Sequence, residues 1–329
     1  MSLRIGVIGT GFAGSTHARA SIGLPGARLA AIAAATIAEA EPLATELGVP
    51  VAPDAAALCE REDVDLVVVA SPTYLHAEHV IAAAKAGKHV FCEKPIARTL
   101  EDARAMVRAC DDAGVRLAIG HVVRFFPEYR RAKELFDAGM LGQAAVVTFT
   151  RGTLPVGAAR AWYLERAKSG GVVLDLMLHD LDVVRWWFGE PAHVYGKRLT
   201  SGGALDYALA TLRYQDRPIV HLEASWAEHA GFRTTFELRG DRGMLAHDSR
   251  AVSPFVVQSA SGDVGTGVVP APTLRETPYR RQLRYLIERL ARGEPPLVDG
   301  REGSRSLGLG LAVIESAERG EVVPWTVPA

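Results

Sequence analysis

The chain has 329 residues, of which 48% are hydrophobic and 23% charged, and its formal net charge is −1. This length predicts two domains. The near-zero charge argues against nucleic acid or an anionic membrane as a partner, since both usually bind basic surfaces. No apolar run approaches the roughly 20 residues that a membrane span needs, and the N-terminal stretch is not expected to be a signal peptide.

The cysteines and histidines indicate a setting and exclude one kind of chemistry. Cys59, Cys92 and Cys110 form no Cys-x-x-Cys pair, and the ten histidines lack the ligand spacing that is typical of zinc sites. We therefore expect a reducing, cytoplasmic environment, ordinary core thiols and no metal.

The first strong signal is a glycine-rich turn near the N-terminus. The apolar run LRIGVI at 3–8 leads directly into GTGFAG, and a helical stretch begins near Ser15. In a dinucleotide-binding turn, Gly9 permits the tight bend, Gly11 lets the backbone approach the pyrophosphate, and Gly14 allows close packing of helix on strand. The helix N-terminus adds free N–H groups that favour phosphate. The residues expected to bind the cofactor here are Gly9, Thr10, Gly11, Phe12, Ala13 and Gly14.

Strand-like and helix-like segments then alternate. Apolar segments at 27–34, 65–70, 88–92 and 115–119 are separated by helix-like stretches near 38–47, 75–86 and 99–113. This alternation predicts a parallel, doubly wound sheet, whose ligands bind beyond the carboxyl ends of the strands. Polar residues follow two of those ends, so the further cofactor candidates are Ser71, Pro72, Thr73, His76, Glu93 and Lys94.

Some of these strand-end residues have an alternative interpretation. His76 is equally compatible with a place on a helix surface, and Glu93 and Lys94 with the solvated end of a strand. Pro95 is expected to fix the backbone after Lys94, with a cis peptide bond as one option.

The end of the second strand does not decide between NAD and NADP. The dinucleotide fingerprint places an acid about 20 residues beyond the glycines, where it binds the adenosine ribose. Here Ala34, Ala35 and Thr36 occupy the position expected near the ribose, and Glu39 is the first acidic residue of the chain. No arginine stands beside them to hold a 2′-phosphate.

Beyond about residue 122 the pattern changes. A helix is predicted near 128–138, strands at 143–151, 205–214, 218–228, 232–239 and 243–247, and closing helices near 278–291 and 302–319. Strands that follow one another without helices predict a mostly antiparallel sheet. Apolar residues fall on both faces of the segments YALA and ASWA, at 207–210 and 224–227. We therefore expect the outer face of this sheet to support self-association.

The fold class predicted from these patterns is α/β with two domains. Residues 1–122 are expected to form a Rossmann-type, doubly wound parallel sheet that binds NAD or NADP. Residues 123–329 are expected to form an α+β domain with a mostly antiparallel open sheet, which binds substrate and carries the oligomer contacts. The last helix has the option of packing back on the first domain.

An acid and a histidine stand four residues apart after a Gly-Gly turn. If residues 173–188 are helical, Asp175 and His179 share one face and are candidates for a proton-transfer pair. The alternative is a capping acid and a core histidine. Arg124 and Trp162 are candidates for the border of the substrate site, with a packing role for Trp162 as the alternative, and Lys168 is a further candidate.

Taken together, these motifs resemble the glucose-fructose oxidoreductase and inositol dehydrogenase (Gfo/Idh/MocA) family of NAD(P)-dependent enzymes. The resemblance runs through the whole chain: Gly9–Gly14, Ser71–His79, Glu93-Lys94-Pro95, Arg124-Phe125, Trp162, Gly170-Gly171 with Asp175 and His179, and the closing helices. It implies that Lys94, Asp175 and His179 are catalytic. It also implies dimers or tetramers.

The resulting expectation is a cytoplasmic oxidoreductase that moves a hydride between nicotinamide and a hydroxyl-bearing carbon of a polyol, sugar or sugar derivative. His179 would accept the hydroxyl proton, Asp175 would orient it or share the proton, and Lys94 would stabilise charge on the reacting oxygen. Two alternatives remain open. One is an enzyme that recycles its bound dinucleotide during a lyase or hydrolase reaction, and the other is a dinucleotide-binding sensor without catalysis.

Overall fold

The computed structural model describes residues 2–154, 161–201, 205–216, 218–251, 255–259 and 276–328. The chain divides into two compact units. Unit 1 comprises Met1–Phe125 and Glu276–Leu307, and unit 2 comprises Phe126–Arg275 and Gly308–Ala329. Unit 1 is therefore built from both ends of the sequence.

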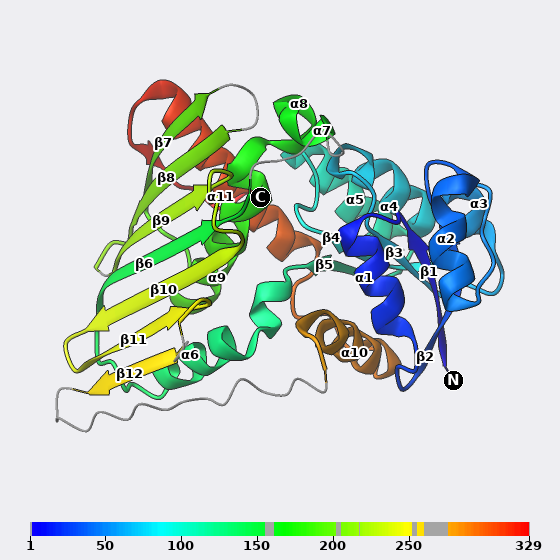
Figure 1. The fold of residues 1–329 in the computed structure, drawn as a ribbon, viewed down its shortest axis with the longest axis horizontal. Helices are drawn as coiled ribbons and strands as arrows, with labels where there is room; N and C mark the ends of the chain where they lie inside the picture. The colour runs from blue at the N-terminus through cyan, green and yellow to red at the C-terminus, as the bar shows by residue number, and fades with distance from the viewer. Residues whose placement is uncertain are drawn as a thin grey trace. The chain divides into compact units, whose positions relative to one another are not determined.

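Unit 1 is a five-stranded parallel sheet, in the order β2-β1-β3-β4-β5, with helices on both faces (Figure 1). Its elements are β1 (Leu3–Ile8), α1 (Phe12–Ser21), β2 (Ala27–Ala33), α2 (Ile37–Leu47), α3 (Ala55–Glu60), β3 (Leu66–Val69), η1 (Thr73–Leu75), α4 (His76–Lys85), β4 (His89–Glu93), α5 (Leu100–Asp112), β5 (Leu117–Gly120), η2 (Val122–Phe125), α10 (Pro278–Ala291) and the first part of α11 (Gly300–Arg319).

Successive residues of each strand point their side chains to opposite faces of this sheet. Ile5 and Val7 of β1 point into a core that also contains Ala18 of α1 and Leu283 of α10. Gly6 points to the opposite face, where a Cβ atom would collide with the side chain of Leu58 in α3. A strand buried on both faces reads as a continuous apolar run, which is why the sequence revealed it.

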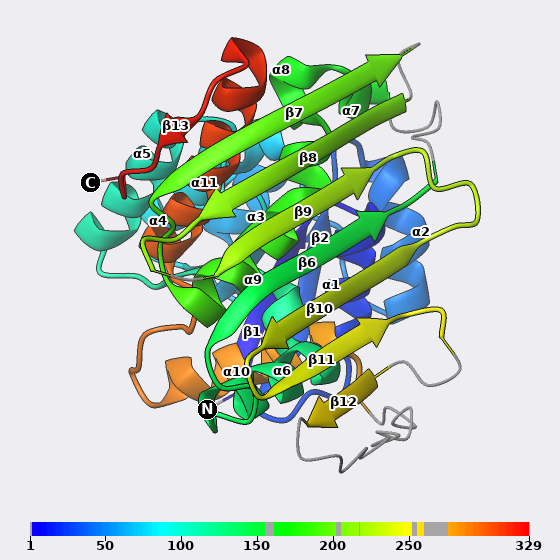
Figure 2. The same cartoon turned by 90° about the vertical axis from the view of Figure 1, so that its left-hand side faces the viewer.

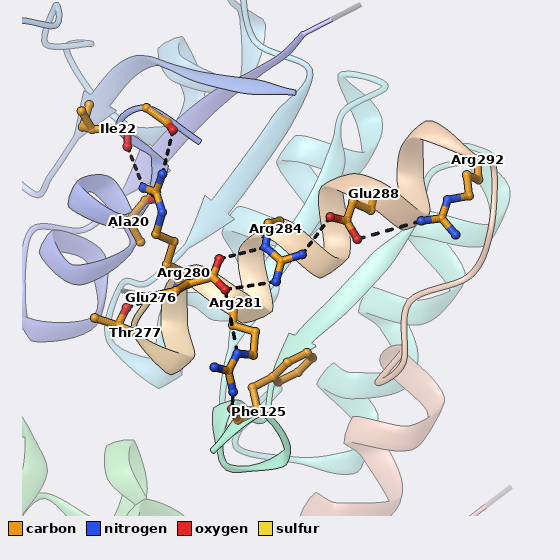
Figure 3. A network of polar contacts seen from close by, with 11 residues as sticks. Ala20, Ile22, Phe125, Glu276, Thr277, Arg280, Arg281, Arg284, Glu288 and Arg292 are labelled. Atoms are coloured by element: carbon orange, nitrogen blue, oxygen red, sulfur yellow. Dashed lines mark hydrogen bonds and ion pairs between the residues drawn. The ribbon is translucent and has the colours of Figure 1, made fainter. Parts of the chain in front are cut away.

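Helix α10 is held against the rest of unit 1 by charged side chains as well as by its apolar face. The guanidinium of Arg280 donates to the carbonyl oxygens of Ala20, Ile22 and Gly23, at 2.8, 2.6 and 2.7 Å (Figure 3). The last carbonyls of a helix have no partner within the helix, so a cation at this end of α1 satisfies both the hydrogen bonds and the helix dipole. Arg284, further along α10, is bracketed by Glu276 and Glu288.

Unit 2 is built around an eight-stranded sheet in the order β12-β11-β10-β6-β9-β8-β7-β13. Its elements are α6 (Pro127–Asp137), β6 (Ala144–Gly152), α7 (Ala161–Leu164), α8 (Arg166–Ser169), the π-helical turn η4 (Val173–Met177), α9 (Leu178–Phe188), β7 (His193–Ser201), β8 (Leu205–Arg213), β9 (Ile219–Ser225), β10 (Arg233–Gly240), β11 (Gly243–Asp248), β12 (Phe255–Ser259), the second part of α11, and β13 (Val323–Pro324).

Helices cover one face of this sheet, and the face turned to the viewer in Figure 2 carries only strands and turns of the described chain. The covered face is aromatic: Phe149 of β6 and Phe236 of β10 meet Trp187 of α9, with ring centroids 5.5 and 5.4 Å apart. Alternate residues of β9 show the same division, since Val220 and Leu222 are buried whereas Ile219 is exposed. One face thus forms the core of unit 2.

The predicted fold class is confirmed, with differences in detail. Most elements lie within two residues of their predicted bounds, but β9 ends at Ser225 rather than at 228. Strand β6 lies between β9 and β10 and is parallel to β9, so strands consecutive in sequence are not all neighbours. The helix expected at 173–188 begins as the π-helical turn η4 and becomes α-helical only at Leu178.

Strand β7 was not predicted. Its sequence, HVYGKRLTS, has a central glycine and few apolar residues, which weakens any strand signal. The glycine has a packing reason, because a Cβ atom on Gly196 would lie 2.3 Å from the carbonyl oxygen of Val313 in α11. The close approach of a helix encoded more than a hundred residues later explains a residue that local pattern cannot.

Candidate active site

The glycine turn between β1 and α1 is shaped by two kinds of glycine. Gly9 has φ +100°, and a Cβ atom on Gly14 would lie 1.9 Å from the Gly9 carbonyl oxygen. Both are therefore needed for the turn itself. Gly11 differs, because its Cβ position has no atom within 4 Å and the residue is the N-cap of α1 without a capping side chain. The space beside Gly11 is thus open at a helix N-terminus, which fits the approach of a phosphate.

Thr10 and Phe12 of this turn differ in their surroundings. The Thr10 hydroxyl donates to the Glu39 carbonyl oxygen at 3.2 Å, and Phe12 is 65% exposed. At the end of β2, Thr36 is the N-cap of α2 and accepts a hydrogen bond from the Glu39 backbone N–H. The hydroxyl of Thr36 therefore caps the N-terminus of α2.

His76 joins the segments that follow β3 and β4. It is 1% exposed, and its ring nitrogens lie 2.9 Å from the carbonyl oxygens of Ser71 and Pro95. The helix-surface alternative for His76 is therefore wrong. Burial lowers the pKa of His76, so the neutral ring is favoured. The Ser71 hydroxyl lies 2.9 Å from Nδ1 of His79 in α4.

Glu93, the last residue of β4, ties this strand end to α1. Its Oε1 lies 2.6 Å from Nε2 of His17, and its Oε2 accepts the backbone N–H of Lys94 at 3.1 Å. Burial acts to raise the pKa of Glu93, but its interactions with His17 and with Lys94 together outweigh this effect, so the pKa is lowered. A Cβ atom on Gly120 would lie 3.0 Å from this carboxyl group, so the neighbouring strand leaves just enough room for it. The solvated-end alternative is wrong for Glu93, which is 7% exposed.

Lys94 follows directly and is half-buried. The Lys94–Pro95 peptide bond is cis, the option that the sequence left open. Because β1, β3 and β4 are parallel neighbours, their carboxyl ends meet at one edge of the sheet. Unit 1 therefore brings the glycine turn, the Ser71–His76 segment and Glu93-Lys94 to the same edge.

Arg124 lies in η2 and is held within unit 1. Its side chain is buried and its Nη2 lies 3.4 Å from Oε1 of Glu302 in α11. Its place at the border of the substrate site stays a prediction.

In unit 2, Asp175 and His179 stand out by exposure. Of residues 171–185, all of which the structure describes, these two alone are not buried. Asp175 lies in the π-helical turn η4 and His179 in the first turn of α9. The three residues between them are buried, so the two ionisable side chains share the partly exposed side of an otherwise buried segment. π-Helical turns inside α-helices are frequent at functional sites.

This segment is anchored by an acid and an arginine that the sequence did not reveal. The Asp206 carboxylate accepts the backbone N–H of Val172 at 2.9 Å and Nε–H of Arg198 at 2.9 Å. Asp175 accepts a hydrogen bond from the indole N–H of Trp226 at 3.0 Å. Asp206 lies 34 residues from Val172 and Trp226 lies 51 residues from Asp175 in sequence, so no local pattern points to these partners.

Trp162 and Lys168 lie on the short helices α7 and α8. Trp162 is half-exposed and its ring centroid lies 4.1 Å from that of Tyr163. Lys168 forms an ion pair with Glu165 at 2.8 Å. Neither contact places these residues in a buried core.

Other kinds of site find no support in the part of the chain that the structure describes. Within it, no group of three histidines, cysteines or acids is arranged to hold a metal ion. No helix there is both long and apolar enough to cross a lipid bilayer.

A glycine turn at a helix N-terminus, on the carboxyl edge of a parallel sheet, is typical of dinucleotide-binding proteins. Known protein families agree. The model of the oxidoreductase family with an NAD-binding Rossmann fold matches residues 3–121, and that of the GFO/IDH/MocA C-terminal domain matches residues 129–246. The chain belongs to the Gfo/Idh/MocA family and is an NAD(P)-dependent oxidoreductase.

Individual relatives span the whole chain. Myo-inositol 2-dehydrogenase of Thermotoga maritima is 31% identical over 329 aligned residues, which cover 96% of each protein. Inositol 2-dehydrogenase of Rhizobium meliloti is 30% identical and covers 98% of this chain and 99% of its own. The crystal structure of a probable dehydrogenase from Thermotoga maritima matches with a TM-score of 0.84 and 30% identity over 98% of both chains.

Proposed function

We propose that the protein oxidises a hydroxyl-bearing carbon of a polyol, sugar or sugar derivative, or catalyses the reverse reduction. The names of two relatives that span the whole chain, both inositol dehydrogenases, support this substrate class. The observation that carries the proposal is the shared exposure of Asp175 and His179 on a buried segment. A proton acceptor in contact with a hydroxyl is what alcohol oxidation requires of the protein.

The cofactor is NAD or NADP, held through Gly9–Gly14 and the strand-end residues Ser71–His76 and Glu93-Lys94. The open space at Gly11 fits its pyrophosphate. When bound, the cofactor would supply the hydride chemistry at the substrate carbon. Ala34, Ala35 and Thr36 lie near the ribose and provide neither an acid nor an arginine to select between the two cofactors.

Three side chains act on the reacting hydroxyl in this proposal. Lys94 donates a hydrogen bond to the oxygen and stabilises the negative charge that develops there. His179 accepts the hydroxyl proton, a role that suits imidazole near neutral pH. Asp175 orients the imidazole or shares the proton. The proposal also includes a domain division at residues 122/123 and a place for Arg124 and Trp162 at the border of the substrate site.

The test combines a substrate screen with two matched pairs of variants. Polyols and sugars are offered with NAD⁺ and with NADP⁺, and nicotinamide absorbance is followed. Lys94→Ala should lower kcat about 10²–10³-fold and His179→Ala about 10²–10⁴-fold. Lys133→Ala on the surface of α6 and His229→Ala in an exposed turn should not. Full turnover by His179→Ala would refute the assignment of the base.

The protein further associates through the open face of the unit 2 sheet. Exposed apolar side chains gather there on three neighbouring strands: Tyr195, Leu199, Leu209 and Ile219. Leu199 is 69% exposed, and such patches usually mark interfaces. Light scattering at micromolar concentration should give a dimer or tetramer, and Leu199→Glu with Leu209→Glu should dissociate it. Val322→Glu, at another exposed apolar position, is the control; a monomeric wild type would contradict this proposal.

The three cysteines are buried and none forms a disulfide. These thiols suit the reducing cytoplasm, which is the location we propose.

A further inference from the structure

Trp226 lies directly after β9 and is one of the largest fully buried side chains of the protein, at 2% exposure. Its indole N–H donates to Oδ2 of Asp175 at 3.0 Å. Asp175 is partly exposed, so the indole reaches from the core of unit 2 to the exposed side of the segment that carries His179. One end of the ring packs, and the other end meets an ionisable group.

The backbone of Trp226 is fixed by the same residue that anchors this segment. Its N–H donates to the Asp206 carbonyl oxygen at 2.9 Å, and the Asp206 carboxylate accepts the N–H of Val172 at 2.9 Å. Asp206 therefore holds both the residue that donates to Asp175 and the chain that leads into η4. The distance between indole and carboxylate is set by two attachments to one strand, β8.

The chemistry of this contact is one-directional. Indole is a hydrogen-bond donor only and cannot accept a proton at ordinary pH. A buried donor without an acceptor is unfavourable, so the indole N–H depends on the oxygen of Asp175 as its acceptor. We propose that Trp226 is a positioning residue for the reaction: it holds the carboxylate of Asp175 in one orientation beside His179. This inference rests on the proposed role of Asp175.

The chain offers a matched control in Trp187 of α9. It is also buried in unit 2, at 4% exposure, but its indole nitrogen has no hydrogen-bond partner among the described residues. Trp187→Phe and Trp226→Phe remove the same atoms from the same unit. Only the second change takes a hydrogen bond from an ionisable group, so a comparison of the two separates positioning from packing.

Trp226→Phe should lower kcat about 10- to 100-fold, the range that corresponds to the loss of a hydrogen bond to a charged group. The KM for the dinucleotide and its binding affinity should stay within about twofold of the wild-type values, because the dinucleotide turn belongs to unit 1. Trp187→Phe should leave kcat within about twofold. In an Asp175→Ala background, Trp226→Phe should lower kcat little further, because its partner is already absent.

The decisive measurement is this double-mutant cycle on whichever polyol or sugar the screen identifies. Equal factors for Trp226→Phe with and without Asp175, or no loss of kcat at all, overturn the inference. Should Trp226→Phe fold poorly, the isostere β-(3-benzothienyl)alanine at position 226 removes the N–H and leaves no cavity, and the same outcomes apply. If Asp175→Ala alone retains full turnover, the proposed role of Asp175 fails; if it does not and Trp226→Phe does, only the inference fails.

Discussion

Gly11 and Gly14 of the cofactor turn should respond differently to an added methyl group: the change at Gly14 should lower stability, and the change at Gly11 should lower cofactor affinity. A Cβ atom on Gly14 would lie 1.9 Å from the Gly9 carbonyl oxygen and 2.7 Å from its carbon. Both opposing atoms are backbone and cannot rotate away. A Cβ atom on Gly11 would have no neighbour within 4 Å, and φ −64° with ψ −170° is open to any residue.

The size of each effect follows from these distances. For Gly14→Ala the turn must open by about 1.5 Å to reach ordinary contact, and overpacking against backbone costs about 3 kcal/mol, the upper part of the usual range. In a domain of this size that lowers Tm by about 6–12 °C. For Gly11→Ala, the poorer N-cap is offset by the lower entropy of the unfolded chain, so stability should change by less than about 1 kcal/mol.

Cofactor affinity separates the two roles. Gly11→Ala places a methyl group where the pyrophosphate approaches the N–H groups of α1, so NAD affinity should fall at least about tenfold. Thermal unfolding without ligand and calorimetric titration with NADH and NADPH measure both quantities. A Gly14→Ala protein that melts with the wild type would refute the packing argument. A Gly11→Ala protein with wild-type affinity would show that the pyrophosphate lies elsewhere.

Three further outcomes are expected. Burial lowers the pKa of three histidines in unit 1, so each is neutral when folded. The stability they contribute is complete above about pH 6.5 and is lost as pH falls through their lowered pKa values. Urea unfolding at about pH 7.5 and 5.5 would detect this loss, and a flat profile would contradict the contribution of these histidines. They are His76, His79 and His89. Asp180→Asn leaves the buried Arg151 uncompensated and should cost about 3–5 kcal/mol in unfolding experiments, against less than about 0.5 for Asp137→Asn in an exposed pair. Ala34→Asp should shift kcat/KM toward NAD, unless the wild type already favours NAD about a thousandfold, in which case the absent acid is not what sets the preference.

The sequence was most informative where one residue type has one physical reason. Glycines that permit close backbone approach, apolar runs buried on both sides and a lysine at a strand end all leave local traces. Such local patterns sufficed for the parallel sheet and for the mostly antiparallel second sheet. The same local rules missed β7, because the glycine at its centre is required by the close approach of α11, a helix distant in sequence.

The π-helical turn shows a second limit. A spacing of four between Asp175 and His179 predicted a shared side, and both residues are the exposed ones of their segment. The spacing held no information about the wider turn that precedes α9, because apolar residues fill an α- and a π-turn equally well. What differs is the hydrogen-bond pattern of the backbone, which side-chain periodicity does not record.

The stretch Glu93-Lys94-Pro95 shows why partners matter more than motifs. Read locally, the acid is a solvated strand end or a cofactor ligand. In the structure it is a buried carboxylate that His17 meets from the helix behind the glycine turn, and it accepts the backbone N–H of Lys94. A charged group is buried at a cost unless hydrogen bonds compensate it, and here those bonds run to the cofactor helix on one side and the lysine on the other. The carboxylate of Glu93 therefore links α1 to Lys94, the proposed electrostatic catalyst, and opposes any displacement of α1.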